Sequence, residues 1–334
     1  MRNLVKPVVV VSKCLGFAHC RFNGLTISSH TVEKFKPHVE FRPVCPEVEI
    51  GLGIPRNPVR IVKEADKLRL MQPATGNDVT DKMTEFAESF LGSVENTDGF
   101  ILKSRSPSCG IKDVKIYPSM EKVGSGLRGI GLFGRAVIEK FSNLPVEDEG
   151  RLTNFRIREH FLTKLFTMAR FRAVKSSLGS PSARNSENSM KELVRFHTES
   201  KLLLMAYNQE KMRILGRIVA NPDKKPFGEL IGSYEEQLVG AFSKAARYTS
   251  NINVLMHGLG YFSKELSSNE KAFFLDSLER YRAESVPLSV PLNIIRSFIV
   301  RFQEDYLVQQ TFFEPYPEEL MEITDSGKGR DTSV

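Results

Sequence analysis

Residues 8–14 read VVVVSKC, four valines followed by a serine, a lysine and a cysteine. The run at 8–12 is short and rich in β-branched residues, which predicts a strand. Two further runs have the same character, VEFRPV at 39–44 and GFIL at 99–102, and apolar residues recur at helical spacing from about 78 to 94. Strands separated by helices predict an α/β N-terminal domain with a mainly parallel sheet flanked by helices.

The pattern changes after about residue 150. LPVEDEG at 144–150 interrupts the preceding helix with a proline, an acidic cluster and a glycine. Beyond it, broad apolar stripes at helical spacing predict an all-α C-terminal domain. A chain of 334 residues can bury two cores. The predicted domains are 1–146, α/β, and 151–320, all-helical, followed by a polar tail at 321–334.

The composition is typical of a globular protein, with 41% hydrophobic and 26% charged residues. The first valine run soon meets Lys13 and has no small-residue cleavage site behind it, so it does not predict a signal peptide. No apolar stretch reaches the length of a membrane span. We therefore expect a cytoplasmic protein with no membrane partner, whose cysteines stay reduced and serve metal binding or catalysis.

Positive charge is concentrated in one segment. Residues 151–217 contain 14 lysines and arginines against 5 acidic residues, a net charge of +9, whereas 1–150 and 218–334 have net charges of +3 and −5. Such a segment is expected of a polyanion-binding surface or of a solvated helix face, and charge alone leaves both open. The candidate RNA-binding residues are its first seven cations: Arg151, Arg156, Arg158, Lys164, Arg170, Arg172 and Lys175.

All four cysteines lie in the first half of the chain, and Cys14, Cys45 and Cys109 each follow a predicted strand. In an open parallel sheet the loops after the strands meet at one edge, so these thiols can converge. Converging thiolates favour zinc or an iron–sulfur cluster, and the absence of a C-x-x-C pair argues against a zinc ribbon. On spacing alone, unrelated buried thiols remain an alternative.

Three sequence motifs resemble those of a known family. CLGFAHCRFNG at 14–24, CPEVEIGLGIPRNP at 45–58 and KSRSPSCG at 103–110 resemble the signature blocks of the TudS thiouracil desulfidase family. Residues 151 to about 320 resemble the YbgA-type helical domain, through FHTESKLLLMA at 196–206 and HGLGYF at 257–262. Together the two parts resemble the two-domain, RudS-like tRNA 4-thiouridine desulfidases.

The resemblance implies that Cys14, Cys45 and Cys109 hold a [4Fe-4S] cluster whose fourth iron stays free for the sulfur of the substrate. It also implies an enzyme that converts 4-thiouridine in tRNA to uridine, with water replacing the sulfur. Cys20 is left outside the ligand set, because a fourth protein ligand would close the open iron.

Glu47 is the candidate general acid/base and Ser106 the second candidate catalytic residue. Without the resemblance, Glu47 would be interpreted as a salt-bridge partner of Arg56 or Arg42, and Ser106 as a turn cap.

Two other functions stay open. One is a desulfidase of free thiouracil-type bases, and the other is a non-catalytic iron–sulfur protein that binds RNA or acts as a sensor. A basic helical domain favours thiolated tRNA as the partner, because an RNA substrate needs contacts to its phosphates. A nicotinamide cofactor is not expected, since GSGLRG at 124–129 matches G-x-G-x-x-G outside a strand–turn–helix unit.

Overall fold

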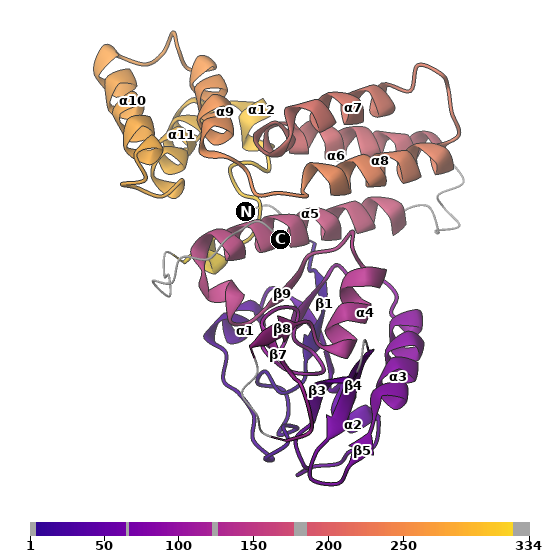
Figure 1. Ribbon diagram of the computed structural model, residues 1–334. Helices are drawn as coiled ribbons and strands as arrows, with labels where there is room; N and C mark the ends of the chain where they lie inside the picture. Colours follow the sequence, from indigo (N-terminus) through magenta and orange to yellow (C-terminus); the bar gives the residue numbers. More distant parts are fainter. Residues whose placement is uncertain (1–4, 65–66, 122–125, 177–185, 323–334) are drawn as a thin grey trace. The chain divides into compact units, whose positions relative to one another are not determined.

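A computed structural model describes residues 5–64, 67–121, 126–176 and 186–322. The chain divides into two compact units inside helix α5 (Phe155–Ser176), between Ala169 and Arg170 (Figure 1). Gly124 of the GSGLRG motif and the predicted polar tail from residue 323 onward lie outside the described residues.

The first sheet consists of four parallel strands in the order β2–β1–β6–β9. Their bounds are Glu40–Val44 for β2, Val8–Ser12 for β1, Gly99–Leu102 for β6 and Val146–Asp148 for β9. In the ladder, Val8 lies opposite Glu40 and Val9 lies opposite Gly99. Every residue of β1 is buried, as expected for a central parallel strand covered on both faces. The mainly parallel sheet predicted from the sequence is confirmed.

The sequence does not predict the second sheet of the first unit. Its order is β5–β4–β3–β7–β8, with bounds Asn77–Asp78, Lys67–Gln72, Arg60–Glu64, Val114–Tyr117 and Leu127–Gly129. Strand β3 pairs antiparallel with β4 and parallel with β7, so the sheet is mixed. In KLRLMQ of β4, cations alternate with leucines, a pattern typical of a strand with one solvated face.

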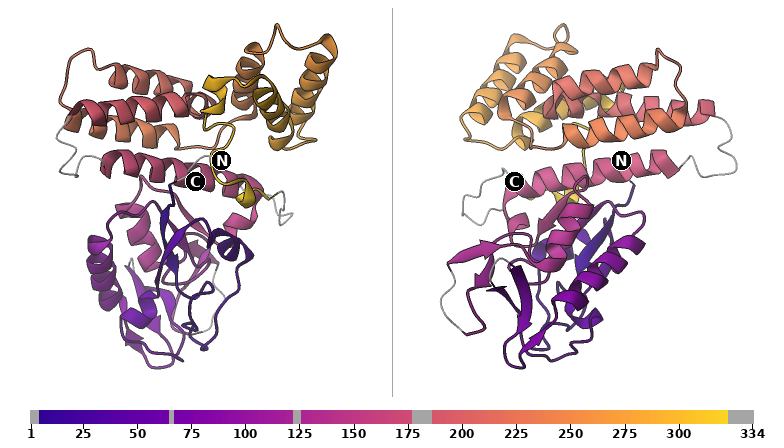
Figure 2. Two further views of the ribbon diagram at one scale, coloured as in Figure 1. Left: turned by 180° about the vertical axis from the view of Figure 1, so that it is seen from behind. Right: turned by 45° about the vertical axis from the view of Figure 1, so that its right-hand side comes forward.

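One hydrophobic core joins both sheets to helices α3 (Thr80–Ser93) and α4 (Leu132–Lys140). The two helices lie on the same side of the strands (Figure 2). The helix predicted at about 78–94 is therefore confirmed as α3. Its buried face consists of Met83, Ala87 and Leu91. The short helices α1 (His30–Phe35) and α2 (Pro46–Glu49) complete the elements before residue 132.

After β9 the described residues form helices joined by loops, with no strand among them, which confirms the predicted all-α C-terminal part. Its α-helices after α5 are α6 (Ser186–Tyr207), α7 (Gln209–Ala220), α8 (Phe227–Ala241), α9 (Tyr248–Gly260), α10 (Ser268–Arg282), α11 (Ser289–Phe302) and α12 (Asp305–Val308). Capping side chains mark where two of these helices begin. Asn208 caps the N-terminus of α7, and Ser267 with Glu270 forms a capping box at the N-terminus of α10. Of the helices described, none is long and apolar enough to cross a membrane.

Candidate active site: a cavity lined by four cysteines

Four cysteines from three segments of the first unit line one cavity of about 240 Å³. Cys14 lies just beyond β1, Cys45 directly follows β2, and Cys109 lies in the turn after β6. Because β2, β1 and β6 are neighbouring parallel strands, their carboxyl ends lie at the same edge of the sheet. The strand order thus brings together the three thiols whose convergence the sequence predicts, and Cys20 joins them.

Cys20 is hydrogen-bonded to Cys14 and to Cys45, and all of the cavity thiols except that of Cys14 belong to buried residues. A hydrogen bond with Cys14 raises the pKa of Cys20, and a hydrogen bond with Cys20, reinforced by burial, raises the pKa of Cys45. Burial raises the pKa of Cys109 to about 12. Cys20, Cys45 and Cys109 therefore favour the neutral thiol, and a positively charged group would be needed to hold them as thiolates.

This set of donors has the soft sulfur chemistry that an iron–sulfur cluster requires. No three His, Cys, Asp or Glu side chains, among the residues that the structure describes, converge closely enough to hold one metal ion. The ligands of an iron–sulfur cluster each bind a different iron atom, so their sulfurs lie farther apart than those around zinc. Cys14, Cys45 and Cys109 reach the cavity from three segments and offer soft sulfur donors, which suits such a cluster.

Glu47 lines the same cavity, and both of its carboxylate oxygens are bound. It belongs to α2, for which Cys45 is the N-cap residue. Arg56 donates from Nε to Oε2 at 2.9 Å, with its Nη2 at 2.8 Å from the same oxygen. Ser108 Oγ donates to Oε1 at 2.9 Å. The salt bridge to Arg56 is thus present, and it holds the carboxylate in a fixed orientation at the cavity.

Packing against α4 fixes the turn that carries Cys109. Ser106 Oγ accepts hydrogen bonds from the backbone N–H groups of Ser108 and Cys109 at 3.2 and 3.1 Å, so Ser106 caps the turn. The amide of Gly134 in α4 donates to the carbonyl of Ser108 at 3.0 Å. A Cβ on Gly134 would lie 2.8 Å from the carbonyl oxygen of Cys109, so glycine permits this close approach.

Sequence reasoning missed two serines of the site. Ser108 is fully buried and binds Glu47. Ser12, the last residue of β1, accepts a hydrogen bond from the amide of Lys103 at 2.9 Å and hydrogen-bonds with Cys109. Two sequence signals could have identified these serines as site residues. Ser12 lies at the end of a predicted strand, and Ser108 lies inside the SPSCG motif.

The seven cations predicted to bind RNA mostly have partners inside the protein. Four of these cations are bound as follows: Arg151 to Glu147, Arg158 to the carbonyl oxygens of Leu152 and Thr153, Arg170 to Glu199, and Lys175 to Glu235. Lys164 is buried, and burial lowers its pKa to about 8. Arg156 is exposed and Arg172 is half-buried. An RNA contact through these residues remains a prediction.

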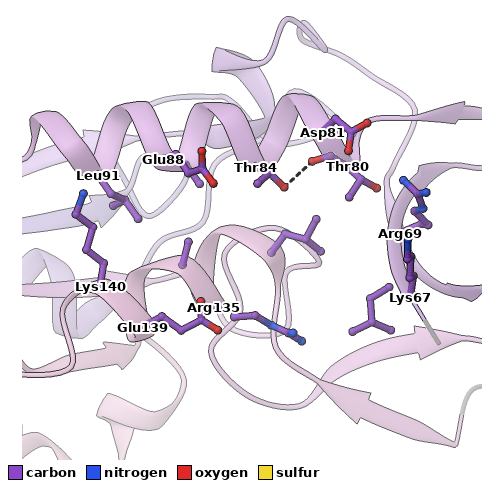
Figure 3. A pocket seen from close by; sticks show the side chains of 14 residues that line it. Lys67, Arg69, Thr80, Asp81, Thr84, Glu88, Leu91, Arg135, Glu139 and Lys140 are labelled. Atoms are coloured by element: carbon purple, nitrogen blue, oxygen red, sulfur yellow. Dashed lines mark hydrogen bonds between the residues drawn. The ribbon is translucent and has the colours of Figure 1, made fainter.

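A larger hollow of about 1060 Å³ lies between α3 and α4. Figure 3 shows Glu88 of α3 and Arg135 of α4 on opposite sides of it, with Lys67 and Arg69 of β4 at one end. Among its described lining residues there is no cysteine, and most of its charged side chains are exposed to solvent. It therefore lacks the buried reactive groups of the cysteine cavity.

Family comparisons agree with the position of the site. The family model described as 2-thiouracil desulfurase matches residues 9–149, which include all four cysteines and Glu47. The model described as a protein of unknown function (DUF1722) matches residues 201–317. The chain belongs to the 2-thiouracil desulfurase family, a family of sulfur-removing enzymes, and has a DUF1722 region in its helical part.

Individual relatives match one part of the chain or the other. The uncharacterized protein YbgA of Escherichia coli (strain K12) is 29% identical over 126 residues, which is 37% of this chain and 75% of that protein. The uncharacterized protein YbbK of Bacillus subtilis (strain 168) is 34% identical over 110 residues, 31% of this chain and 73% of that protein. A solved structure of the [4Fe-4S]-dependent thiouracil desulfidase TudS is 26% identical, covers 44% of this chain and 93% of its own, and has a TM-score of 0.34. The predicted resemblance to the desulfidase family and to a YbgA-type domain is confirmed.

Proposed function

We propose that this protein removes the sulfur of 4-thiouridine in tRNA, leaving uridine, with a [4Fe-4S] cluster held by Cys14, Cys45 and Cys109. The observation that carries the proposal is the convergence of these thiols and Glu47 on one cavity. Membership in the 2-thiouracil desulfurase family supports a thiolated pyrimidine as the substrate. Because the cavity is only about 240 Å³, an RNA substrate has to extrude the target base from its stack.

The residues around the cavity have distinct roles in this proposal. When bound, the cluster supplies a Lewis-acidic iron that attracts the thione sulfur and polarises the C=S bond. Glu47 accepts a proton from the water that adds to the thiolated carbon, and it donates a proton as the sulfur leaves. Arg56 and Ser108 keep the carboxylate aimed into the cavity, since each holds one of its oxygens.

Ser106 has a second role besides capping. Its oxygen accepts two backbone hydrogen bonds, and the residue also lines the cavity. Its hydroxyl hydrogen can therefore point to the sulfur of Cys109 or to the attacking water. We assign Ser106 to orienting that water.

The choice of tRNA is supported by the net charge of +9 in residues 151–217 and by the helical unit, which a free base would not need. A desulfidase of free thiouracil-type bases is the second candidate, favoured by the internal partners of Arg151, Arg158, Arg170 and Lys175. Either reaction requires reduced thiols, which supports our proposal of a cytoplasmic location.

The test is sulfide release by the anaerobically purified full chain. Iron-loaded protein is given tRNA that contains 4-thiouridine or, separately, free 4-thiouracil, over a series of salt concentrations. We expect turnover of the tRNA that falls with rising salt, and loss of activity after the iron is chelated. Release from the free base alone would support the second candidate, and an iron-loaded protein that acts on neither would overturn the assignment as an enzyme.

A further inference from the structure

Cys20 is the cysteine that the proposed function leaves without a role. It is 2% exposed and lines the cavity together with the three cysteines assigned to the cluster. A fourth protein ligand would close the iron that the sulfur of the substrate needs, so Cys20 stays outside the ligand set. The presence of a thiol at this position therefore needs another explanation.

The contacts of Cys20 are made with other thiols. Its side chain is hydrogen-bonded to those of Cys14 and Cys45, and Cys45 Sγ also lies 3.7 Å from the carbonyl oxygen of Cys20. A thiol is a weak hydrogen-bonding group, and a serine hydroxyl would serve better for hydrogen bonding alone. What a thiol adds beside other thiols is the ability to form a bond to sulfur.

Cys14 is the accessible partner of Cys20. It is half-buried, whereas Cys20, Cys45 and Cys109 are buried. An oxidant that enters from the solvent therefore reaches Cys14 first. Redox-sensitive cysteines are exposed thiols that often lie beside a second, resolving cysteine, and Cys14 and Cys20 have this arrangement.

The backbone between the two residues allows their sulfurs to come closer. Cys14 and Cys20 lie in one loop, and its described residues 13–29 form turns without a helix or a strand. A disulfide requires the sulfurs to approach to about 2.05 Å, and such a loop can supply the movement. Cys45, in contrast, directly follows β2 and is the N-cap residue of α2, so two regular elements hold it. The geometry thus favours a bond between Cys14 and Cys20 over one between Cys20 and Cys45.

We propose that Cys20 is a resolving cysteine, which forms a reversible disulfide with Cys14 when the cluster is absent and a peroxide is present. Hydrogen peroxide oxidises the Cys14 thiol to a sulfenic acid and is itself reduced to water. The Cys20 thiol then attacks the Cys14 sulfur, the S–S bond forms, and the hydroxyl leaves with the Cys20 proton as a second water. A dithiol reductant restores both thiols.

The disulfide preserves Cys14 as a ligand. Without a resolving thiol, a sulfenic acid is oxidised further to a sulfinic acid, which dithiols do not reverse. While the disulfide lasts, Cys14 cannot bind iron, so loading of the cluster requires a reductant. The inference rests on the proposed function, because that proposal makes Cys14 a cluster ligand.

The test maps the oxidation products of the full chain before iron loading. The protein is treated with hydrogen peroxide, its free thiols are blocked, and it is digested with trypsin without reduction. Cleavage after Lys13 and Arg21 releases both cysteines in one peptide, residues 14–21. We expect mass spectrometry to find this peptide unblocked and lighter by two hydrogen atoms, and to find both thiols free after dithiothreitol. A bond to Cys45 or Cys109 would instead join two peptides.

Two variants separate the roles of the thiols. Cys20→Ser should accumulate sulfinic acid at Cys14 and lose most of its capacity to bind iron after peroxide and dithiothreitol, whereas without peroxide it should load iron like the wild type. Cys45→Ser is the matched control for the pairing and should still form the disulfide within peptide 14–21.

Two results would overturn the inference. One is a wild-type protein in which peroxide produces only sulfinic acid at Cys14 or bonds to Cys45. The other is a Cys20→Ser protein that recovers its full iron capacity after the same treatment. Neither measurement uses sulfide release, so a failure here is distinct from a failure of the proposed function.

Discussion

The basic segment at 151–175 and the cysteine cavity are both rich in cations, but they use them differently. In the segment, Arg151 is paired with Glu147 and Arg170 with Glu199. In the cavity, by contrast, Arg105 has no carboxylate partner among the described residues. The number of charges along a helix is therefore a poor guide to a binding surface, and charges that the fold leaves without a carboxylate partner are a better one.

The two hollows of the first unit lead to the same conclusion. The α3–α4 hollow is several times larger, yet most of its charged side chains are exposed to solvent and it contains no cysteine among the residues described. The cysteine cavity is small, but it gathers buried thiols, a fixed carboxylate and cations. Convergence of reactive groups, rather than volume, distinguishes a site.

The largest effect is expected for Cys109→Ser. If the cavity is the functional region, loss of this ligand should remove the cluster and reduce sulfide release below detection, while the fold is retained because serine is nearly isosteric with cysteine. Iron analysis and the visible absorption spectrum measure this result. Cys20→Ser is the control and should keep its iron. A Cys109→Ser protein with a full complement of iron would contradict the ligand assignment.

A smaller loss of activity is expected for Glu47→Gln. Removing a general acid/base lowers the rate by about 10²- to 10⁴-fold, and the cluster should remain, because glutamine does not change the thiols. The measurement is the rate of desulfuration per bound iron. Glu49→Gln in the same helix is the control, since Glu49 is exposed and outside the cavity lining. Equal rates for both variants would remove Glu47 from the mechanism.

Arg151→Ala should instead affect stability. Arg151 Nε lies 2.8 Å from Glu147 Oε2, with the side chains 8% and 15% exposed, so the substitution leaves a buried carboxylate without its partner. The expected cost is about 3 kcal/mol of unfolding free energy. Arg156→Ala, which changes an exposed residue, should cost far less.

The loss of unfolding free energy in Arg151→Ala should become smaller as the pH falls. Burial raises the pKa of Glu147, and Arg151 opposes that rise, so the variant should have a still higher pKa. The carboxylate is charged and unpaired at about pH 8, and becomes protonated as the pH falls, so the difference in stability from the wild type should shrink toward about pH 5. Denaturation curves at the two pH values measure it. Unchanged stability together with weaker tRNA binding would make Arg151 a binding residue and would contradict its role as the structural partner of Glu147.

Local patterns predicted the first sheet and the helical part well, but not the second sheet. VVVVS and GFIL are continuous apolar runs because strands β1 and β6 are buried on both faces. Strand β4 alternates cations with leucines, and β5 has only two residues, so neither produces such a run. Ser108 was missed for a related reason: its importance depends on a contact with Glu47, 61 residues away in the sequence.

Residue identity along the chain specifies which chemistry is available: three cysteines placed after strands, a carboxylate two residues from one of them, and an α/β part followed by helices. These features depend on residue type and short-range spacing, which the chain carries in any conformation. Long-range contacts specify which charges remain uncompensated, because pairing depends on carboxylates that are remote in sequence. Glu149 neutralises Lys103 from 46 residues away, whereas Arg105, two residues beyond Lys103, has no partner in the described chain.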